Sequence, residues 1–315
     1  MTSREQVTRP GAATAVAAPA PRRGAGRVAR QERLGYVFTL PVALVLFLFT
    51  LGPGLYALYL SFFSWSLLNH MRFVGGVNYA SLLTDPLFWI AVRNTAVFSL
   101  VVVPTQTVVA LIIAVILHQN LPARRFFRLA FFFPAVSSSA VISVIFMWIY
   151  NKFGLMNSFL GLFHITGPDW LGNPSFALPA IMMLNIWTTS GYFMVIFLAG
   201  LQSIPPQLHE AAQVDGASPW KTFTRITIPL LRPTTFFIVV MGLIGTLQMF
   251  DQSFIMSQGT GGPLYATTTV VLLIYQFIFA YGKVGYGAAA TVLLFLLILG
   301  ATLATNRWLG KSIEY

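Results

Sequence analysis

The sequence contains no cysteine and few charged residues. The lack of cysteine excludes disulfides, zinc sites with cysteine ligands and thiol chemistry. Charged residues make up 9% of the chain, whereas soluble domains carry roughly 25%. A water-soluble fold with so few charges would expose too much apolar surface to stay dispersed. We also expect no metal site, because the histidines lie far apart, with no carboxylate at ligand spacing: His70, His118, His164 and His209.

The chain contains several long apolar runs. Hydrophobic residues make up 57% of the chain, and its mean hydropathy is +0.75. A transmembrane helix needs about 20 mostly apolar residues. The chain is therefore predicted to be an all-α, polytopic membrane protein with six transmembrane helices. The predicted spans are about 36–63, 94–117, 127–150, 176–200, 233–256 and 286–308.

The distribution of lysine and arginine predicts the orientation of these spans. Positive residues gather in the cytoplasmic parts of membrane proteins. Fifteen of the nineteen fall in the N-terminal tail, the second and fourth connections and the C-terminal tail. Both termini are therefore predicted to be cytoplasmic. The positive charge is thus explained by the orientation of the spans in a lipid bilayer. We therefore expect no nucleic-acid binding.

The chain divides into two regions of different composition. Residues 1–33 are rich in alanine, proline and arginine and have no apolar periodicity, so they are predicted to form a disordered, basic, cytoplasmic tail. Residues 34–312 are predicted to form one transmembrane domain. Its extracytoplasmic connections are polar and rich in turn residues.

The connection at about 205–229, between the fourth and fifth spans, differs from the others. Pro205-Pro206 can start a helix, because proline suits the first turn, and Ser203 is expected to cap it. Glu210 is expected early in this helix, where a carboxylate interacts favourably with the helix dipole. Gly216 is expected to end the helix, because glycine readily adopts the left-handed conformation found there.

A second amphipathic piece is predicted after Ser218-Pro219. The small side chains of Ala211 and Ala212 let the preceding helix enter a groove on another protein, and the acids Glu210 and Asp215 offer groups for a partner to bind. From the residues alone two interpretations stay open. The segment is either a docking helix or an amphipathic helix that lies at the membrane interface.

The same segment resembles the EAA loop of ABC importer permeases. That loop consists of Glu-Ala-Ala, a short spacer, a glycine, and later Ile-x-Leu-Pro. Here Glu210-Ala211-Ala212 precedes Gly216, and Ile226-Thr227-Ile228-Pro229 follows, with Ile228 in the usual place of leucine. The stretches 198–205 and 261–267 are similar to the carbohydrate-importing branch, in particular to its maltose- and glycerol-3-phosphate-type first permease. The resemblance covers roughly residues 35–310.

This resemblance implies a permease subunit of the cell inner membrane, in an ATP-driven importer for a sugar, oligosaccharide or glycerol-phosphate-type solute. It implies as partners two copies of an ABC ATPase subunit, a second homologous permease chain and an extracytoplasmic solute-binding lipoprotein. ATP and magnesium would be used by the ATPase subunit, so this chain would need no cofactor and would not be an enzyme. The implied ATPase-docking residues are Glu210, Ala211, Ala212, Asp215, Gly216 and Pro219.

One motif near the C-terminus is a false lead. Gly310-Lys311-Ser312 is similar to the end of a phosphate-binding loop. That loop also needs a glycine where Thr305 stands. We therefore expect ATP to bind to another subunit.

Asp251 is the one acidic residue inside a predicted span, and an ionisable residue there is a functional candidate. It supports an alternative function, an ion-coupled secondary transporter, although such carriers usually show more intramembrane acids or broken helices. The other interpretation places Asp251 near the outer end, hydrated or paired. The candidate solute contacts are Asn185, Trp187, Thr188, Ser190, Gln248 and Asp251. Their alternative role is hydrogen bonding between helices.

Overall fold

The computed structural model describes residues 38–66, 70–119 and 121–309. The predicted tail, residues 1–33, and the Gly310-Lys311-Ser312 motif lie outside these ranges. The chain falls into two units, residues 1–54 and 55–315. The described part of the first unit is an apolar helix that includes the π-helical stretch η1 (Phe47–Leu51) and continues into α2 (Gly52–Leu60).

Within the described residues, five helices are long and apolar enough to cross a membrane. They confirm five of the six predicted spans, with ends that differ by a few residues in most cases. The largest difference is in α4, which begins eight residues before the predicted start. The five helices are Phe38–Leu60, α4 (Pro86–His118), α8 (Pro174–Ser203), Arg232–Met256 and Val284–Arg307 within α15 (Val284–Leu309).

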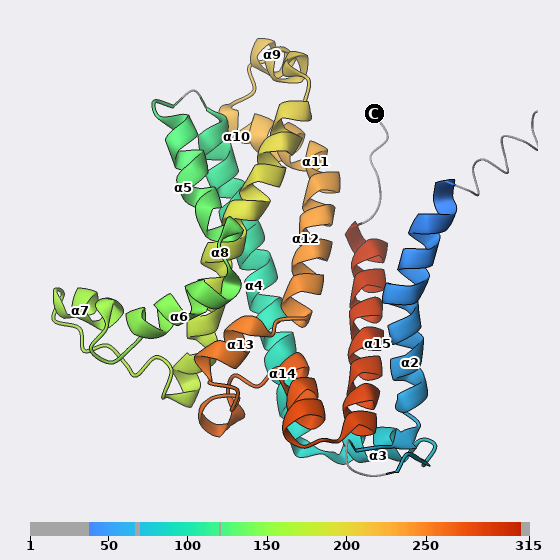
Figure 1. Ribbon diagram of the computed structural model, residues 1–315. Coiled ribbons are helices and arrows are strands. Elements are labelled where there is room, and N and C mark those ends of the chain that lie inside the picture. Colours follow the sequence, from blue (N-terminus) through green and yellow to red (C-terminus); the bar gives the residue numbers. More distant parts are fainter. Residues whose placement is uncertain (1–37, 67–69, 120, 310–315) are drawn as a thin grey trace, which may run out of the picture. The chain divides into compact units, whose positions relative to one another are not determined.

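The third predicted span, 127–150, is not one straight helix. It consists of α5 (Arg124–Val136) and α6 (Ser139–Ile149), which are bent by 99° relative to each other. Figure 1 shows α6 turning sideways from the end of α5. The 13 residues of α5 cover about 20 Å, less than the roughly 30 Å of a bilayer core. The break has a local cause, because Pro134 lacks a backbone donor and the polar residues Ser137 and Ser138 are extended.

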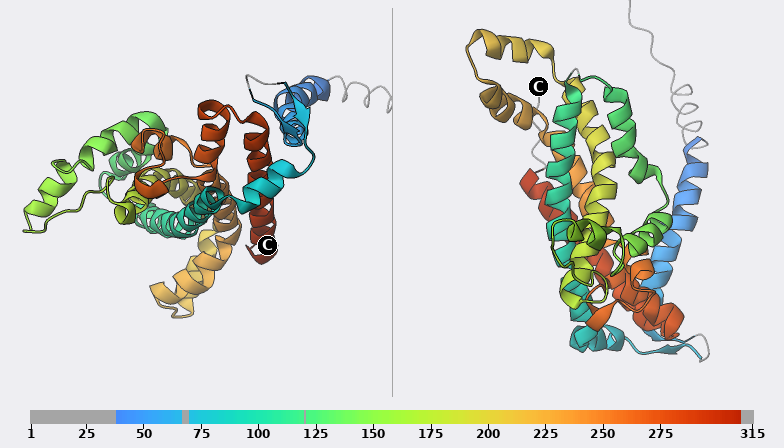
Figure 2. Two further views of the ribbon diagram at one scale, coloured as in Figure 1. Left: turned by 90° about the horizontal axis from the view of Figure 1, so that it is seen from below. Right: turned by 90° about the vertical axis from the view of Figure 1, so that its left-hand side faces the viewer.

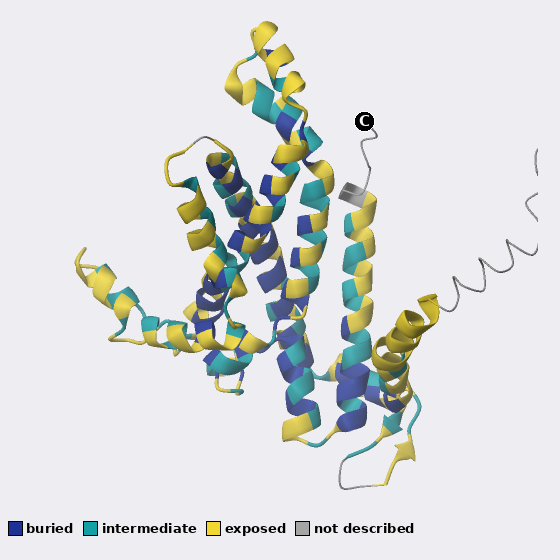
Figure 3. Ribbon diagram, turned by 45° about the horizontal axis from the view of Figure 1, so that its top comes forward, coloured by how far each residue is buried: buried dark blue, intermediate teal, exposed yellow. Residues whose placement is uncertain are grey.

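Helices α4, α8 and α12 (Arg232–Leu247) form the centre of the second unit. Many of the buried residues of this unit lie on them, above all on α4 and α8, as Figure 3 shows by colour. Small residues on α4, such as Ala110 and Ala114, lie against larger ones on α8, such as Phe193 and Phe197. Small side chains allow apolar helices to approach closely in a membrane, where water does not drive them together.

A second cluster of buried residues joins α15 to the short apolar helix Val270–Ala280, which comprises α14 (Val270–Tyr275) and η4 (Gln276–Ala280). This helix was not predicted from the sequence, because it is too short to span a bilayer. Other short elements are α3 (Val77–Thr84), α7 (Leu155–Gly161), α13 (Asp251–Met256), η3 (Pro263–Tyr265) and the antiparallel pair β1 (Phe63–Ser64) and β2 (Arg72–Phe73).

The second unit has two ends with different elements. Helices α9 (Pro206–Val214) and α10 (Pro219–Thr222) and the start of α5 lie at one end, and α3 with the β1–β2 pair lies at the other (Figures 1 and 2). We call the first of these the α9 end. The predicted docking segment lies at the α9 end. The predicted solute contacts on α8 lie part of the way along that helix.

Candidate functional site

The start of α9 differs from the prediction. Helix α8 continues to Ser203, whose hydroxyl donates a hydrogen bond to the carbonyl of Gly200 at 2.7 Å, so Ser203 does not cap α9. Pro205 occupies the N-cap position instead, without a side-chain bond. Glu210 lies in the second turn of α9, and the first turn contains no acidic residue. The expected interaction of Glu210 with the start of the helix dipole is therefore wrong.

The end of α9 confirms the predicted role of Gly216. Its φ is +71°, in the left-handed region that favours glycine. The amide of Gly216 donates to the carbonyl of Gln213 at 3.0 Å, and the amide of Ala217 donates to the carbonyl of Ala212 at 2.9 Å. These two bonds form a Schellman motif, which satisfies the last carbonyls of the helix. Gly216 thus lets the chain turn back sharply.

Most residues of α9 are exposed (Figure 3). Of the implied docking residues, only Ala212 is buried. Glu210, Ala211, Asp215, Gly216 and Pro219 are exposed. Apolar side chains are exposed beside them, with Val214 at 88% and Trp220 at 73%. Exposed apolar residues next to exposed acids are typical of a surface that meets another protein.

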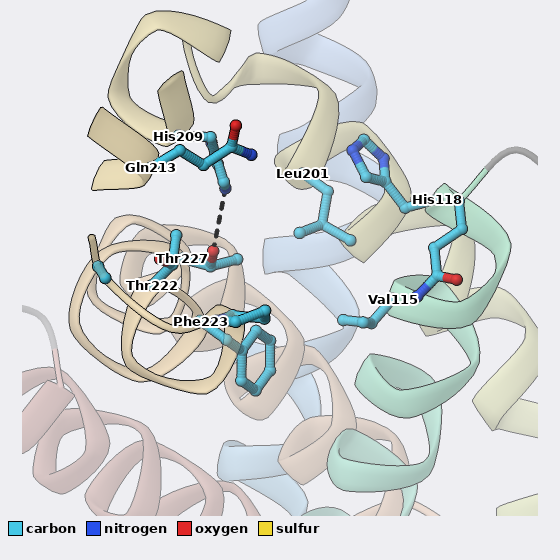
Figure 4. Close-up of a pocket in the computed structure, with 11 residues that line it drawn as sticks. Val115, His118, Leu201, His209, Gln213, Thr222, Phe223 and Thr227 are labelled. Carbon is cyan, nitrogen blue, oxygen red and sulfur yellow. Dashed lines mark hydrogen bonds between the residues drawn. The ribbon is translucent and has the colours of Figure 1, made fainter. Parts of the chain in front are cut away.

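The segment after Gly216 also begins as predicted. The hydroxyl of Ser218 accepts a hydrogen bond from the amide of Lys221 at 3.4 Å, and a helical path follows through α10, η2 (Phe223–Thr227) and α11 (Ile228–Leu230). Nε2 of His209 lies 3.3 Å from Oγ1 of Thr227, which connects α9 to η2 (Figure 4). A cavity of about 300 Å³ lies beside this contact. It is lined by both α9 and the end of α4.

Three of the predicted solute contacts come together in a second cavity. Asn185, Gln248 and Asp251 line a space of about 220 Å³ with Ser139 and Gln252. Helix α12 ends at Leu247 and α13 begins at Asp251, so a break in the fifth span presents these side chains. The amide nitrogen of Asn185 donates to Oε1 of Gln252 at 2.9 Å, which joins α8 to α13.

A neighbouring cavity of about 330 Å³ shares three of these residues and adds Thr188. The hydroxyl of Thr188 donates to carbonyls of its own helix. The other residues that line this cavity include Pro134, Ser137, Thr189 and Tyr192. We call the two cavities together the α8–α13 cavities.

Trp187 and Ser190 line neither of the α8–α13 cavities. Trp187 is half exposed, and its ring contacts that of Phe146. Ser190 is buried, and its hydroxyl donates to the carbonyl of Ile186. The structure therefore does not bring these two residues together with the other candidates.

Sequence reasoning missed Ser139 and Gln252, which line both cavities. Gln252 directly follows Asp251, and Ser139 ends a run of three serines at the break between α5 and α6. A run of serines after a proline in an apolar stretch is a signal for such a break. Sequence reasoning missed Gln106 as well. Its side chain is fully buried, and its Oε1 accepts a hydrogen bond from the hydroxyl of Thr189 at 2.6 Å.

The depth of Asp251 can be judged from its neighbour Asn185. Asn185 is the twelfth of the 30 residues of α8, so it lies about 17 Å along the axis from the start of the helix. Because Asn185 and Asp251 line the same cavity, Asp251 lies beside the inner part of α8 and not beside its first turn. Asp251 is exposed to the cavity.

Apolar spans around a polar cavity, with an exposed helix at one end, define a membrane transport subunit. Residues 106–314 match the family model for the binding-protein-dependent transport system inner membrane component, and the chain belongs to this family. It is therefore a permease subunit of an ABC transporter, a non-catalytic, multi-pass component of the inner membrane. The family resemblance drawn from the EAA-type loop is confirmed.

Several curated relatives cover most of the chain. The lactose transport system permease protein LacF of Rhizobium radiobacter is 36% identical over 86% of this chain and 91% of its own. The trehalose/maltose transport system permease protein MalF of Thermococcus litoralis is 33% identical over 87% of this chain and 92% of its own. Among solved structures, a bacterial ABC transporter that imports the acidic polysaccharide alginate has a chain with a TM-score of 0.76 at 23% identity, covering 92% of this chain and 99% of that one. That likeness supports the fold.

Proposed function

We propose that this permease conducts a carbohydrate through the α8–α13 cavities in an ATP-driven importer. Relatives that share a third of its residues are named for lactose, for trehalose and maltose, for arabinooligosaccharides and for sulfoquinovosyl glycerol. The cavities offer amide and hydroxyl groups from Asn185, Thr188 and Gln252 and an aromatic ring from Tyr192. Amides, hydroxyls and rings are the groups that bind a hydroxylated solute in a mostly apolar pocket.

We also propose that α9 and the turn at Gly216 dock the ATPase subunit. The observation that carries this proposal is the exposed helix held by a Schellman turn, with acids and apolar residues on its surface. ATP and magnesium then act in the ATPase, which transmits its closure to α9. The contact between His209 and Thr227 and the burial of Ala212 link α9 to the spans.

Charge supports a cytoplasmic position for the α9 end, and with it cytoplasmic termini. Basic residues gather in the elements at this end, and positive residues favour the cytoplasmic side. They are Arg124, Arg125, Arg128, Lys221, Arg225, Arg232 and Arg307. The opposite end then faces a solute-binding lipoprotein. A second, homologous permease chain completes the path, and a second ATPase subunit docks on that chain.

Purification of the tagged chain from its native membrane tests the assembly. We expect an ATPase subunit, a second six-span chain and a binding lipoprotein to co-purify, with ATP hydrolysis. Glu210→Lys should lower ATPase recovery, because it reverses an exposed charge on α9, and Glu210→Gln should lower it less. Ser81→Lys, on the exposed surface of α3 at the opposite end, is the matched control. Recovery of a lone chain indifferent to ATP would contradict the proposal and favour an ion-coupled carrier that uses Asp251.

A further inference from the structure

A cavity of about 350 Å³ lies between the β1–β2 pair, α3 and the start of α15, at the end opposite to α9 (Figure 1). Ser64 pairs with Arg72 in the β1–β2 ladder, and Ser66 pairs with Lys283 in an isolated bridge. Directly paired residues share a face, and so do residues two apart in a strand. Arg72 and Lys283, which are distant in the sequence, therefore meet on one side of this strand, and both line the cavity. We call it the hairpin cavity.

The backbone that carries these two cations is held in place by several contacts. The side-chain nitrogen of the buried Asn78 on α3 donates to the carbonyls of Ser61 at 2.8 Å and Phe63 at 2.9 Å. The amide of Gly285 donates to the carbonyl of Trp65 at 3.3 Å. A Cβ on Gly285 would lie 1.8 Å from the carbonyl oxygen of Phe63, so the glycine lets α15 begin directly against the strand. The hairpin cavity is thus formed before any ligand arrives.

The gathering of cations in the hairpin cavity is not explained by the orientation of the spans. Positive residues are depleted at the extracytoplasmic side of a membrane protein. Four of the basic residues fall in the predicted extracytoplasmic segments, namely Arg72, Arg93, Lys152 and Lys283. Two of these four line one cavity, and His70 lines it as well.

The two cations have no counter-ion in the part of the chain that the structure describes. No carboxylate is among the described residues that line the hairpin cavity, and neither Arg72 nor Lys283 forms an ion pair with a described residue. Asp85 lies behind the lining residue Tyr286, whose hydroxyl donates to Oδ2 of Asp85 at 3.2 Å. Oδ1 of the same carboxylate accepts from the amide of Leu87 at 2.9 Å. An anion that enters the cavity therefore meets two cations whose charge is not balanced.

The hydrogen-bonding groups and the size of the hairpin cavity fit a phosphate group. The hydroxyls of Ser64 and Ser66 also line it and form no hydrogen bond with the described residues. Arginine, lysine and hydroxyl groups together are the donors that phosphate oxygens accept from. The volume falls in the range of small-molecule sites, roughly 300–1,000 Å³, so a carboxylate side chain alone would fill only part of it.

The position of the hairpin cavity places it at the surface of the bilayer. The first span ends at Leu60, and the last begins at Val284, directly after Lys283. Exposed aromatic residues lie beside the cations, with Phe73 at 67% and Tyr281 at 58%. Aromatic and basic residues together are typical of the level of the lipid headgroups. The phosphate groups available at this level are those of the lipids themselves.

We propose that the hairpin cavity binds the phosphate group of an anionic phospholipid from the leaflet at this end of the spans. One cation pairs with the phosphate, and the second disfavours a zwitterionic lipid because it repels the ammonium group of that lipid. The hairpin cavity shares no lining residue with the α8–α13 cavities, so this inference does not depend on the identity of the solute.

Photoactivatable lipids test the site directly. The assembled transporter is placed in nanodiscs of phosphatidylcholine that contain a trace of phosphatidylglycerol or phosphatidylcholine with a photoactivatable acyl chain. After illumination, mass spectrometry measures how much of each probe is attached to the peptides that carry the β1–β2 pair and the start of α15. We expect about tenfold more attachment of phosphatidylglycerol, a ratio that corresponds to about 1.4 kcal/mol.

Arg72→Gln combined with Lys283→Gln should bring this ratio close to about one, because both cations are lost. Arg93→Gln combined with Lys152→Gln is the matched control, since it removes the same charge from exposed positions outside the hairpin cavity. The control should keep the full ratio. Arg72→Lys keeps the charge and should retain most of the ratio. Each single glutamine variant should give an intermediate ratio, so the inference stays testable if the double variant does not assemble with its ATPase.

Three results would overturn the inference. A ratio near one in the native chain, or an equal loss in the two double variants, would mean that the hairpin cavity selects no lipid. A ratio that disappears when glycerol phosphate or inorganic phosphate is added in large excess would mean a site for a soluble anion. If the variant of Arg72 and Lys283 keeps the ratio but no longer recovers a binding lipoprotein, the cavity receives an acidic group of that protein instead.

Discussion

The amide nitrogen of Asn185 lies 2.9 Å from Oε1 of Gln252, a residue 67 positions later in the chain. The first residue belongs to the continuous helix α8, and the second to α13, which begins after the break at 248–250. The bond therefore holds the broken part of the fifth span against an intact span. It also fixes the neighbour of Gln252, Asp251, beside the cavity that both helices line.

Replacing either partner of this bond should destabilise the protein modestly. We expect Asn185→Ala and Gln252→Ala each to lower the free energy of unfolding by about 0.5–1.5 kcal/mol. The double variant should show a coupling of about 0.6 kcal/mol, the average for hydrogen bonds between membrane helices. Denaturant unfolding of the four forms gives the cycle. Purely additive effects would mean that the two side chains do not stabilise each other.

Gly216 offers a test of the turn itself. Gly216→Pro cannot adopt φ near +71°, and it also removes the amide that donates to Gln213. Gly216→Ala keeps the amide, but a left-handed conformation costs such a residue about 1–2 kcal/mol. ATPase recovery and sugar uptake should therefore fall with alanine and be lost with proline. Membrane abundance should stay unchanged, because the turn lies outside the spans.

Gly216→Asn is the matched control for this series, because asparagine tolerates the left-handed conformation better than other residues with a side chain. No atom lies within 4 Å of the position where a Cβ would stand, so the side chain itself has room. Asparagine should therefore retain most ATPase recovery. If the proline variant transports as well as the native chain, α9 does not couple the ATPase.

The basic tail should be dispensable for transport. Deleting residues 2–25 removes a segment without apolar periodicity that precedes the first span, so little packing should be lost. Uptake, normalised to the amount of chain in the membrane, should stay within about twofold of the native value, a difference of about 0.4 kcal/mol. A truncated chain that inserts at native abundance and transports nothing would contradict this expectation.

Local signals in the sequence predict the parts of the structure that depend on nearby residues. Apolar length locates five spans, and Gly216 marks a helix end, because only glycine adopts positive φ at little cost. The bend after α5 was missed, since apolar run length does not register the short polar break after Pro134. Gln252 was missed because its partner Asn185 is distant in the sequence. Pairings of this kind follow from how the helices pack, which one sequence does not specify.

Two glycines in the spans should respond differently to the same small change. A Cβ on Gly191 of α8 would lie 1.8 Å from the backbone oxygen of Phe131 on α5, so the two helices would have to move apart. A Cβ on Gly245 of α12 would meet no atom within 4 Å, and Gly245 lines one of the α8–α13 cavities. We expect Gly191→Ala to destabilise the protein by about 1–3 kcal/mol, as overpacking does.

Gly245→Ala should leave stability unchanged or raise it by up to about 1 kcal/mol, since alanine is the better helix former. Thermal unfolding of the purified transporter compares the two variants directly. Gly245→Trp should then fill the cavity and block sugar uptake in a protein that still binds its ATPase. Equal destabilisation by the two alanines would mean that α5 does not pack closely on α8. Normal uptake with the tryptophan would mean that the sugar does not pass this cavity.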